Sequence, residues 1–207
     1  MLEARAGRIT PQIEAVAKKE QRDVEFIRSR VAAGTIVIPA NVNHTSLVPC
    51  GIGRELLTKI NANIGNSSTS SCPREEYEKL DTALKYGADT VMDLSTGGNI
   101  ELIRRAIIAR STVPVGTVPV YEMVARAGAK AISKDLMLQV IAEQAEQGVD
   151  YMTVHAGLRR KYVPLAIKRK LGIVSRGGAL LAAWMSETGN ENPFYEFFDD
   201  ILKICLE

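Results

Sequence analysis

Gly148-Val-Asp-Tyr-Met-Thr-Val-His-Ala-Gly157 and Gly87-Ala-Asp-Thr-Val-Met-Asp-Leu94 share one pattern, in which glycine, a small apolar residue and aspartate precede an apolar run. In both stretches the glycine follows about three turns of helical periodicity. A glycine at that place ends a helix, and the apolar run that follows predicts a buried strand. Helices and strands that alternate in this way indicate a parallel sheet with helices packed outside it.

The alternation continues along most of the chain. We expect strands at residues 57–64, 90–94, 113–120, 151–154 and 173–174. We expect helices at residues 73–86, 100–110, 134–147, 162–170, 178–187 and 194–206. Ser71 and Ser133 are the expected N-caps of the first and third of these helices.

The first fifty residues predict a small helical appendage. Thr10-Pro11 begins a helix that runs to Lys19, Asp23 begins another that runs to Ala33, and residues 35–39 form a short strand. We therefore divide the chain into an appendage, residues 1–50, and an α/β domain, residues 51–207.

Two architectures fit five strand-helix units. A doubly wound sheet predicts a glycine-rich phosphate turn directly after the first strand, and residues 61–68 do not supply one. A (βα)8 barrel of the TIM type needs about 250 residues. Because all five strands end in polar residues, as they would at a barrel mouth, we expect an incomplete barrel and keep the doubly wound sheet as the alternative.

Composition excludes several classes of protein. The net charge of +2 includes no basic block, which argues against a strongly electrostatic nucleic-acid or membrane-surface binder. Neither a membrane span nor a secretory signal is present, so we expect a cytoplasmic protein. Three widely spaced cysteines, Cys50, Cys72 and Cys205, match no disulfide framework and no metal knuckle.

Polar residues at the expected strand ends are the candidates for a binding site, because parallel α/β proteins bind ligands there. Ser175, Arg176, Gly177 and Gly178 begin a helix and could seat a phosphate on its amides, as could the turn at residues 95–98. The other candidates are His155 for proton exchange, Asn63 and Asn66 for hydrogen bonding, Tyr121 for stacking and Met92 as an apolar wall. The alternatives are a structural histidine, turn-forming asparagines and a core methionine. From the residues alone we infer a small phosphorylated ligand.

The strand-end motifs closely resemble those of the thiamin pyrimidine synthase (ThiC) superfamily. The resemblance covers the whole chain and rests on these motifs: Lys59-Ile-Asn-Ala-Asn-Ile-Gly-Asn-Ser67, Asp89-Thr-Val-Met-Asp-Leu-Ser-Thr-Gly-Gly98, Val113-Pro-Val-Gly-Thr-Val-Pro-Val-Tyr121, Gly148-Val-Asp-Tyr-Met-Thr-Val-His-Ala-Gly157, Gly172-Ile-Val-Ser-Arg-Gly-Gly178 and Glu191-Asn-Pro-Phe-Tyr-Glu196.

The resemblance implies a radical S-adenosylmethionine (SAM) enzyme with a (βα)8 barrel that acts on aminoimidazole ribotide. It implies that Asn63, Met92, Tyr121 and His155 hold the imidazole and ribose, that residues 175–178 help to seat the phosphate, and that His155 is catalytic. One branch of the superfamily makes the thiamin pyrimidine and another makes 5-hydroxybenzimidazole. The short appendage and the residues at 49–50 and 121–123 favour the hydroxybenzimidazole branch, with the thiamin branch as the alternative.

The sequence also departs from the superfamily pattern. It lacks two later strand-end motifs, the histidines of a divalent metal site such as zinc, and the C-x2-C-x4-C that binds a [4Fe-4S] cluster. We therefore interpret the chain as a truncated enzyme, inactive alone, which forms a homo-oligomer through its open barrel edges. A non-catalytic half-barrel that binds a phosphorylated ligand is the hypothesis from another class.

Overall fold

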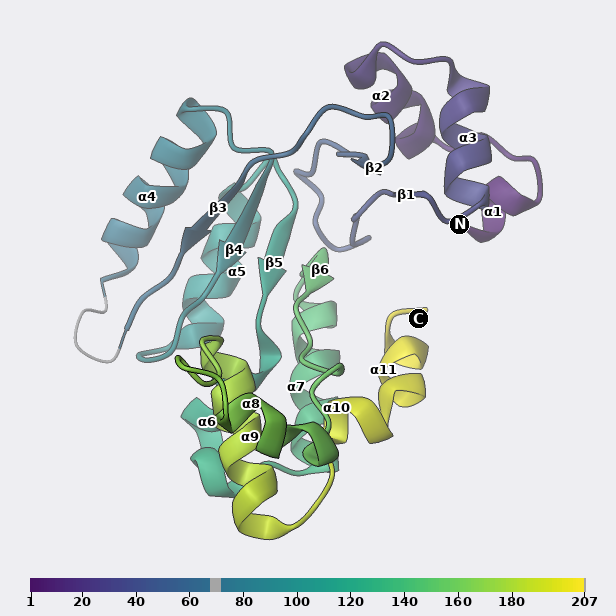
Figure 1. Cartoon of the computed structure of the whole chain (residues 1–207). Coiled ribbons are helices and arrows are strands. Elements are labelled where there is room, and N and C mark those ends of the chain that lie inside the picture. The colour runs from purple at the N-terminus through teal and green to yellow at the C-terminus, as the bar shows by residue number, and fades with distance from the viewer. Residues whose placement is uncertain (68–71, 207) are drawn as a thin grey trace.

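The computed structural model describes residues 1–67 and 72–206, and its centre is a four-stranded parallel sheet (Figure 1). The strands follow the order β3-β4-β5-β6: β3 (Asn61–Ile64), β4 (Thr90–Asp93), β5 (Val115–Thr117) and β6 (Tyr151–Met152). Spatial order equals chain order, so these strands contain no switch point of the kind that a doubly wound sheet requires. The sheet stays open within the described residues, in agreement with the expected incomplete barrel.

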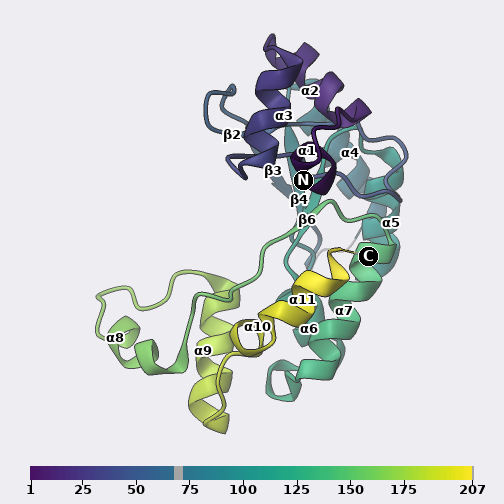
Figure 2. The same ribbon diagram turned by 90° about the vertical axis from the view of Figure 1, so that its right-hand side faces the viewer.

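Helices cover one face of this sheet. Helices α4 (Pro73–Lys85), α5 (Ile100–Arg110) and α7 (Lys134–Glu146) lie to the right of the sheet in Figure 2; in Figure 1, α5 and α7 lie behind the strands and α4 lies to the left of β3. The apolar side chains between α4, α5 and the strands form one core cluster: Ile64, Leu80, Val91, Ile103, Ile107, Ile108, Val115 and Val149. The predicted helices of these units are confirmed to within one residue. The first strand, expected at residues 57–64, begins only at Asn61, and the second and fourth strands end one and two residues earlier than expected. Ser133 caps α7 by accepting from the Leu136 amide at 3.2 Å, whereas Ser71 lies outside the described residues.

A second core lies at the other end of the sheet from the N-terminal helices. It joins α6 (Pro119–Ala127), α7, α9 (Arg176–Thr188), α10 (Pro193–Glu196) and α11 (Phe198–Ile204). Met123, Met137, Leu181, Met185 and Phe194 are fully buried in it. Figures 1 and 2 both show these helices together, and Figure 2 shows that α8 (Val163–Ile167) projects away from them on the side of α9.

Two strand predictions are wrong in detail. The third strand, expected to reach residue 120, ends at Thr117 because Pro119 cannot donate to a ladder and instead begins α6. The fifth strand, expected at 173–174, does not form: Val174 is 74% exposed, and these residues pair with no described strand. Ile173 and Val174 are β-branched and have strand propensity. A strand is stable, however, only when a neighbouring strand can form hydrogen bonds with its backbone.

The C-terminal helices also differ from expectation. The helix expected at 162–170 is shortened to α8, and the basic residues 168–170 lie beyond it. The helix expected at 194–206 is divided into α10 and α11 at Phe197, whose φ of −111° and ψ of 30° are not helical. Helix α6 and the short α1 (Leu2–Arg5) were not predicted.

The N-terminal helices have a core of their own. Helices α2 (Pro11–Glu20) and α3 (Val24–Ala32) begin at the predicted caps Thr10 and Asp23. With α1 they enclose Ile13, Val16, Ile27, Val31 and Ile36. The antiparallel pair of β1 (Ile36–Val37) and β2 (Ile52–Gly53) crosses the expected boundary at residues 50 and 51, and the domain division stays a prediction.

The homo-oligomer also stays a prediction. No described helix is long and apolar enough to cross a membrane.

A buried ion pair joins the loop before β2 to the start of the sheet. His44 Nδ1 lies 2.7 Å from an Asp150 carboxylate oxygen and His44 Nε2 lies 2.9 Å from the Ser111 carbonyl oxygen, and both side chains of the pair are fully buried. The same aspartate accepts from the amides of Asn41 at 2.9 Å and Val115 at 2.8 Å. Both ring nitrogens of His44 face acceptors, an arrangement that favours the doubly protonated ring. Burial opposes this charge, but the bonds to Asp150 and Ser111 outweigh it and raise the pKa of His44.

This pair predicts a pH-dependent contribution to stability. A raised pKa means that the folded chain holds the proton more tightly than the unfolded chain, so the contribution is full below the unfolded pKa of about 6.5 and is lost as the pH rises through the folded pKa. We expect His44→Asn to lower the free energy of unfolding by about 1–3 kcal/mol at low pH and by less at high pH. Urea unfolding of both proteins across this range measures the difference. A difference that does not change with pH would contradict a charged His44.

Candidate functional site

The face of the sheet opposite α4 and α5 carries polar side chains. Tyr151 crosses this face above Gly116, where an added Cβ would lie only 2.3 Å from the tyrosine ring. Its hydroxyl donates to Asn61 Oδ1 at 3.0 Å, and the Thr90 hydroxyl donates to the same oxygen at 3.0 Å. Sequence reasoning missed Tyr151 as a member of this site, although a glycine inside a strand signals such a close approach.

Asn63 and Met92 lie side by side on this face. They are register partners in the parallel pair β3–β4. Asn61 donates from Nδ2 to Asn63 Oδ1 at 2.8 Å, which orients the Asn63 amide. Its NH2 group donates to no acceptor among the described residues, so it can donate to a ligand. Met92 is partly buried and packs against the second core, so the structure gives it a packing contact as well as a place on this face.

His155 lies in the loop that follows β6 and contacts the beginning of α9. Its Nε2 is 3.1 Å from Ser175 Oγ. Its Nδ1 is buried and has no hydrogen-bond partner in the described part of the chain. Burial lowers the pKa of His155, and the imidazole is therefore neutral at pH 7. A neutral imidazole with one unpartnered nitrogen can give a proton to a ligand or take one from it.

The N-terminus of α9 offers donors for an anion. Ser175 is its N-cap and accepts from the Gly178 amide at 3.2 Å. Within residues 72–206 the amides of Arg176 and Gly177 have no acceptor, as expected for the first turn of a helix. The Arg176 guanidinium carbon lies 5.5 Å from the centre of the Tyr121 ring. Two amides, a guanidinium and the helix dipole together favour a bound phosphate.

Gly177 lets the imidazole approach the helix. A Cβ at this position would be 2.3 Å from His155 Cε1 and 2.6 Å from Nε2. The sequence-predicted residues His155, Ser175, Arg176, Gly177, Gly178 and Tyr121 are thus brought together, and Asn63 and Met92 form a separate pair on the sheet. Met92 and Tyr121 both pack against the second core, but no hydrogen bond or ion pair among the described residues joins the two groups.

The turn at residues 95–98 does not offer a comparable seat. The Ser95 amide donates to Asp93 Oδ1 at 3.0 Å, and the Thr96 amide donates to the Asn66 carbonyl at 3.0 Å. Burial raises the pKa of Asp93, which its bonds from Ser95 only partly oppose. With these amides engaged and a carboxyl group inside the turn, this turn is a poor phosphate site.

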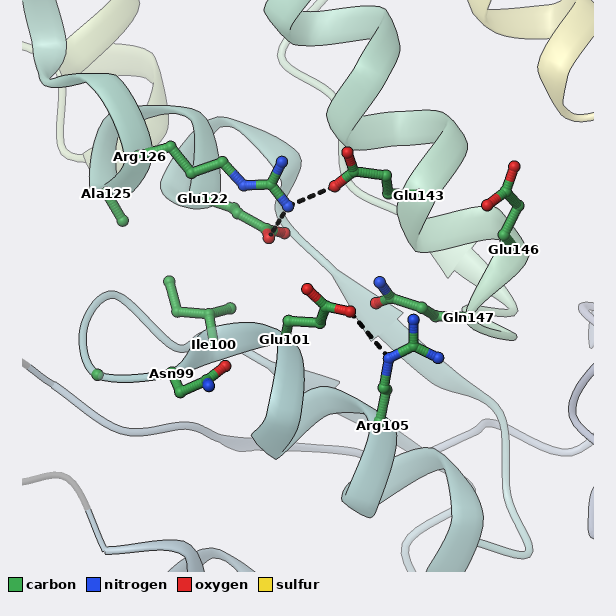
Figure 3. A pocket seen from close by; sticks show the side chains of 11 residues that line it. Asn99, Ile100, Glu101, Arg105, Glu122, Ala125, Arg126, Glu143, Glu146 and Gln147 are labelled. Atoms are coloured by element: carbon green, nitrogen blue, oxygen red, sulfur yellow. Dashed lines mark hydrogen bonds and ion pairs between the residues drawn. The ribbon is translucent and has the colours of Figure 1, made fainter.

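A charged cavity of about 750 Å³ lies between α5, α6 and α7 (Figure 3). Arg126 contacts both Glu122 and Glu143, and Arg105 pairs with Glu101. The fully buried Arg104 donates to Glu122 at 2.6 Å behind this cavity. Each of these arginines is paired with a carboxylate. We therefore interpret the charged side chains around the cavity as a structural network that joins the three helices.

The described residues do not form a metal or cluster site. Cys50 is buried, Cys72 half-buried and Cys205 exposed, and no group of three metal-ligating side chains occurs among the residues that the structure describes. The residues that the structure describes therefore fit neither a [4Fe-4S] cluster nor zinc, and we assign no step of a reaction to either.

The fold and the candidate site together define a class: a parallel α/β protein of the barrel type, with the His155 imidazole beside the N-terminus of a helix. Comparison with known proteins gives the family. A model of the Radical SAM ThiC family matches residues 1–207, and the chain belongs to this family. Membership of a radical SAM family implies that the full-length proteins use a [4Fe-4S] cluster and SAM.

Curated relatives agree with this assignment. The chain is 56% identical to a phosphomethylpyrimidine synthase of Natronomonas pharaonis over 97% of the chain and 42% of that protein. It is 56% identical to the phosphomethylpyrimidine synthase of Haloarcula marismortui over 100% of the chain and 43% of that protein. The corresponding protein of Halobacterium salinarum is 52% identical over 97% of the chain and 42% of its own length. The chain thus spans less than half of these relatives.

Two glycines of the site region provide a matched pair of substitutions. We expect Gly177→Ala to lower the free energy of unfolding by about 1–3 kcal/mol, because the added methyl group must displace His155. Gly157 lies within the turn that follows His155, and an added Cβ there would meet nothing within 4 Å. Gly157→Ala should therefore change the free energy of unfolding by less than about 0.5 kcal/mol. Denaturant unfolding measures both. Equal effects of the two substitutions would show that Gly177 does not limit the approach of His155.

Proposed function

We propose that this chain carries substrate-binding residues of a phosphomethylpyrimidine synthase and that its ligand is aminoimidazole ribotide. The observation that carries the proposal is the neutral imidazole of His155 beside the free amides at the beginning of α9. Such a site suits a ligand with a phosphate at one end and an exchangeable proton nearby. The family match and the names of the relatives support the choice of ligand.

Each residue has a stated role in this proposal. The free amides of Arg176 and Gly177 form the phosphate seat at the helix beginning that Ser175 caps through the Gly178 amide, and the Arg176 guanidinium adds a charge-assisted hydrogen bond. His155 exchanges a proton with the ligand. Asn63, Met92 and Tyr121 contact the imidazole ring and the ribose, for which the free Asn63 NH2 group and the tyrosine face are suited.

The comparisons support the thiamin branch instead of the hydroxybenzimidazole branch that the sequence favoured. All three relatives bear the thiamin-pathway name, at 52%, 56% and 56% identity. The short appendage and the residues at 49–50 and 121–123 are poor guides to the branch, since they lie in a chain that matches those relatives over 97–100% of its length.

We further propose that the described chain binds the ribotide without converting it. Its described cysteines do not form the cluster that supplies radical chemistry in a radical SAM enzyme. The binding function and the reaction are therefore separable by experiment.

Calorimetry with the ribotide tests the seat. We expect the wild-type chain to bind and Arg176→Ala to weaken binding about 10-fold, the effect of losing one charge-assisted hydrogen bond. Arg105→Ala is the matched control, because Arg105 is exposed on α5 and pairs with Glu101 in the charged cavity. Heat release that Arg105→Ala abolishes and Arg176→Ala leaves intact would place the ligand in that cavity and overturn the proposal.

His155 is tested in a longer protein that contains this chain and turns over. We expect His155→Ala to reduce the rate at least about 100-fold, which is typical for a positioned acid-base group. His155→Gln keeps a hydrogen-bonding side chain but cannot exchange a proton near pH 7, and it should be equally slow. Product formation at the wild-type rate by either variant would return His155 to a structural role.

A further inference from the structure

The loop that carries His155 has little support from the sheet. Strand β6 is only two residues long and pairs with β5 alone among the described strands. After it, the Thr153 amide donates to the Thr117 carbonyl at 2.8 Å, and the loop then leaves the sheet. The one backbone bond of the turn that follows, from the Leu158 amide to the His155 carbonyl, is 3.4 Å long. Another part of the chain must therefore hold His155 in place.

Asn192 supplies this support. It is 0% exposed, and its Nδ2 donates to the His155 carbonyl at 2.7 Å and to the Leu158 carbonyl at 2.7 Å. One amide thus joins the two ends of the turn. Its Oδ1 accepts from the Phe194 amide at 3.0 Å and caps α10. Every hydrogen-bonding atom of this buried side chain has a partner, and each bond requires an amide in this orientation.

Glu191 extends the support to the end of the loop. Its Oε1 accepts from the Arg160 amide at 2.7 Å and from the Asn192 amide at 3.0 Å. Burial alone would raise the pKa of Glu191, but these two amides and the charge of Arg159 lower it. The carboxylate is therefore ionised and holds the backbone at neutral pH. Arg159 in turn lies 4.0 Å from the centre of the Tyr195 ring.

We propose that Glu191 and Asn192 are positioning residues, which hold the His155 loop against α9 so that the imidazole reaches Ser175. The proposal rests on the function proposed for His155. It gives a role to the Glu191-Asn-Pro-Phe-Tyr-Glu196 segment, whose Glu191 and Asn192 contact the backbone of this loop.

Asn192→Ser tests the proposal. Serine is a good N-cap, so it can still accept from Phe194, but it is too short to donate to both loop carbonyls. Asn99→Ser is the matched control, because Asn99 caps α5 by accepting from the Leu102 amide at 3.0 Å and holds no loop. The same substitution then retains a cap at both positions and removes the loop contacts only at residue 192.

The imidazole NMR spectrum of the ligand-free chain is the measurement. The chain contains two histidines, so both rings can be followed in one titration, and His44 reports whether the fold is intact. In the wild type we expect His155 to titrate below the usual value of about 6.5. In Asn192→Ser we expect its midpoint to rise toward that value as the loop opens to water, while His44 stays unchanged. Asn99→Ser should leave both rings as in the wild type.

An unchanged His155 midpoint in a folded Asn192→Ser variant would overturn the proposal. If that variant unfolds, both rings titrate as in a free peptide, and Glu191→Ala decides instead. Glu191 keeps 19% of its side chain exposed, so its removal leaves the second core intact. A raised His155 midpoint in Glu191→Ala supports positioning, and an unchanged midpoint overturns it.

Ribotide binding is then measured on the same variants. We expect Asn192→Ser to weaken it about 10-fold, whereas Asn99→Ser leaves it unchanged. A wild-type chain that does not bind the ribotide, but whose His155 midpoint moves in Asn192→Ser, would overturn the proposed function and leave the positioning role in place.

Discussion

Parallel pairing in chain order is the constraint on which the rest of this structure depends. It places the ends of β3, β4, β5 and β6 at one edge, so that residues far apart in sequence share one surface. The register sets Asn63 beside Met92 and Met92 beside Gly116, and Gly116 beside Tyr151. Since Gly116 has no side chain, the Tyr151 ring can cross the sheet and reach Asn61. The polar face is therefore a consequence of register.

Buried charge fixes the two ends of this sheet. At the start of β5 and β6, Asp150 holds His44 and the Val115 amide. At the end of β5, Thr117 donates to Gln144, which donates to Glu122 at 2.6 Å, and Glu122 also accepts from Arg104. A buried charge without its partner is strongly unfavourable, so each network allows little displacement of the elements that it joins. This rigidity suits a site whose residues come from several elements.

Local signals in the sequence predict most of the helices and the positions of the first four strands, and the structure brings His155, Tyr121 and residues 175–178 together. The caps Thr10, Asp23 and Ser133 act within three residues, and the glycine-aspartate pattern acts within one turn, so both can be recognised without a structure. The fifth strand could not be judged in this way, because its formation depends on a ladder partner. Tyr151 and Asn192 were missed for the same reason: their partners lie 90 and 34–37 residues away. Pro119 is a local signal for the end of the third strand, but the strand propensity of its valine neighbours favoured a longer strand and led to the wrong end point.

The most direct test of the central claim is to map backbone amide shifts of the chain as aminoimidazole ribotide is added. If the ligand binds at the strand ends, the largest shifts will occur at the amides of Arg176 and Gly177, which have no acceptor among the described residues, and at the His155 ring. Shifts centred on Glu101, Arg126 and Glu143, which line the charged cavity, would place the ligand between the helices. That result, or no shift at α9, would contradict the account.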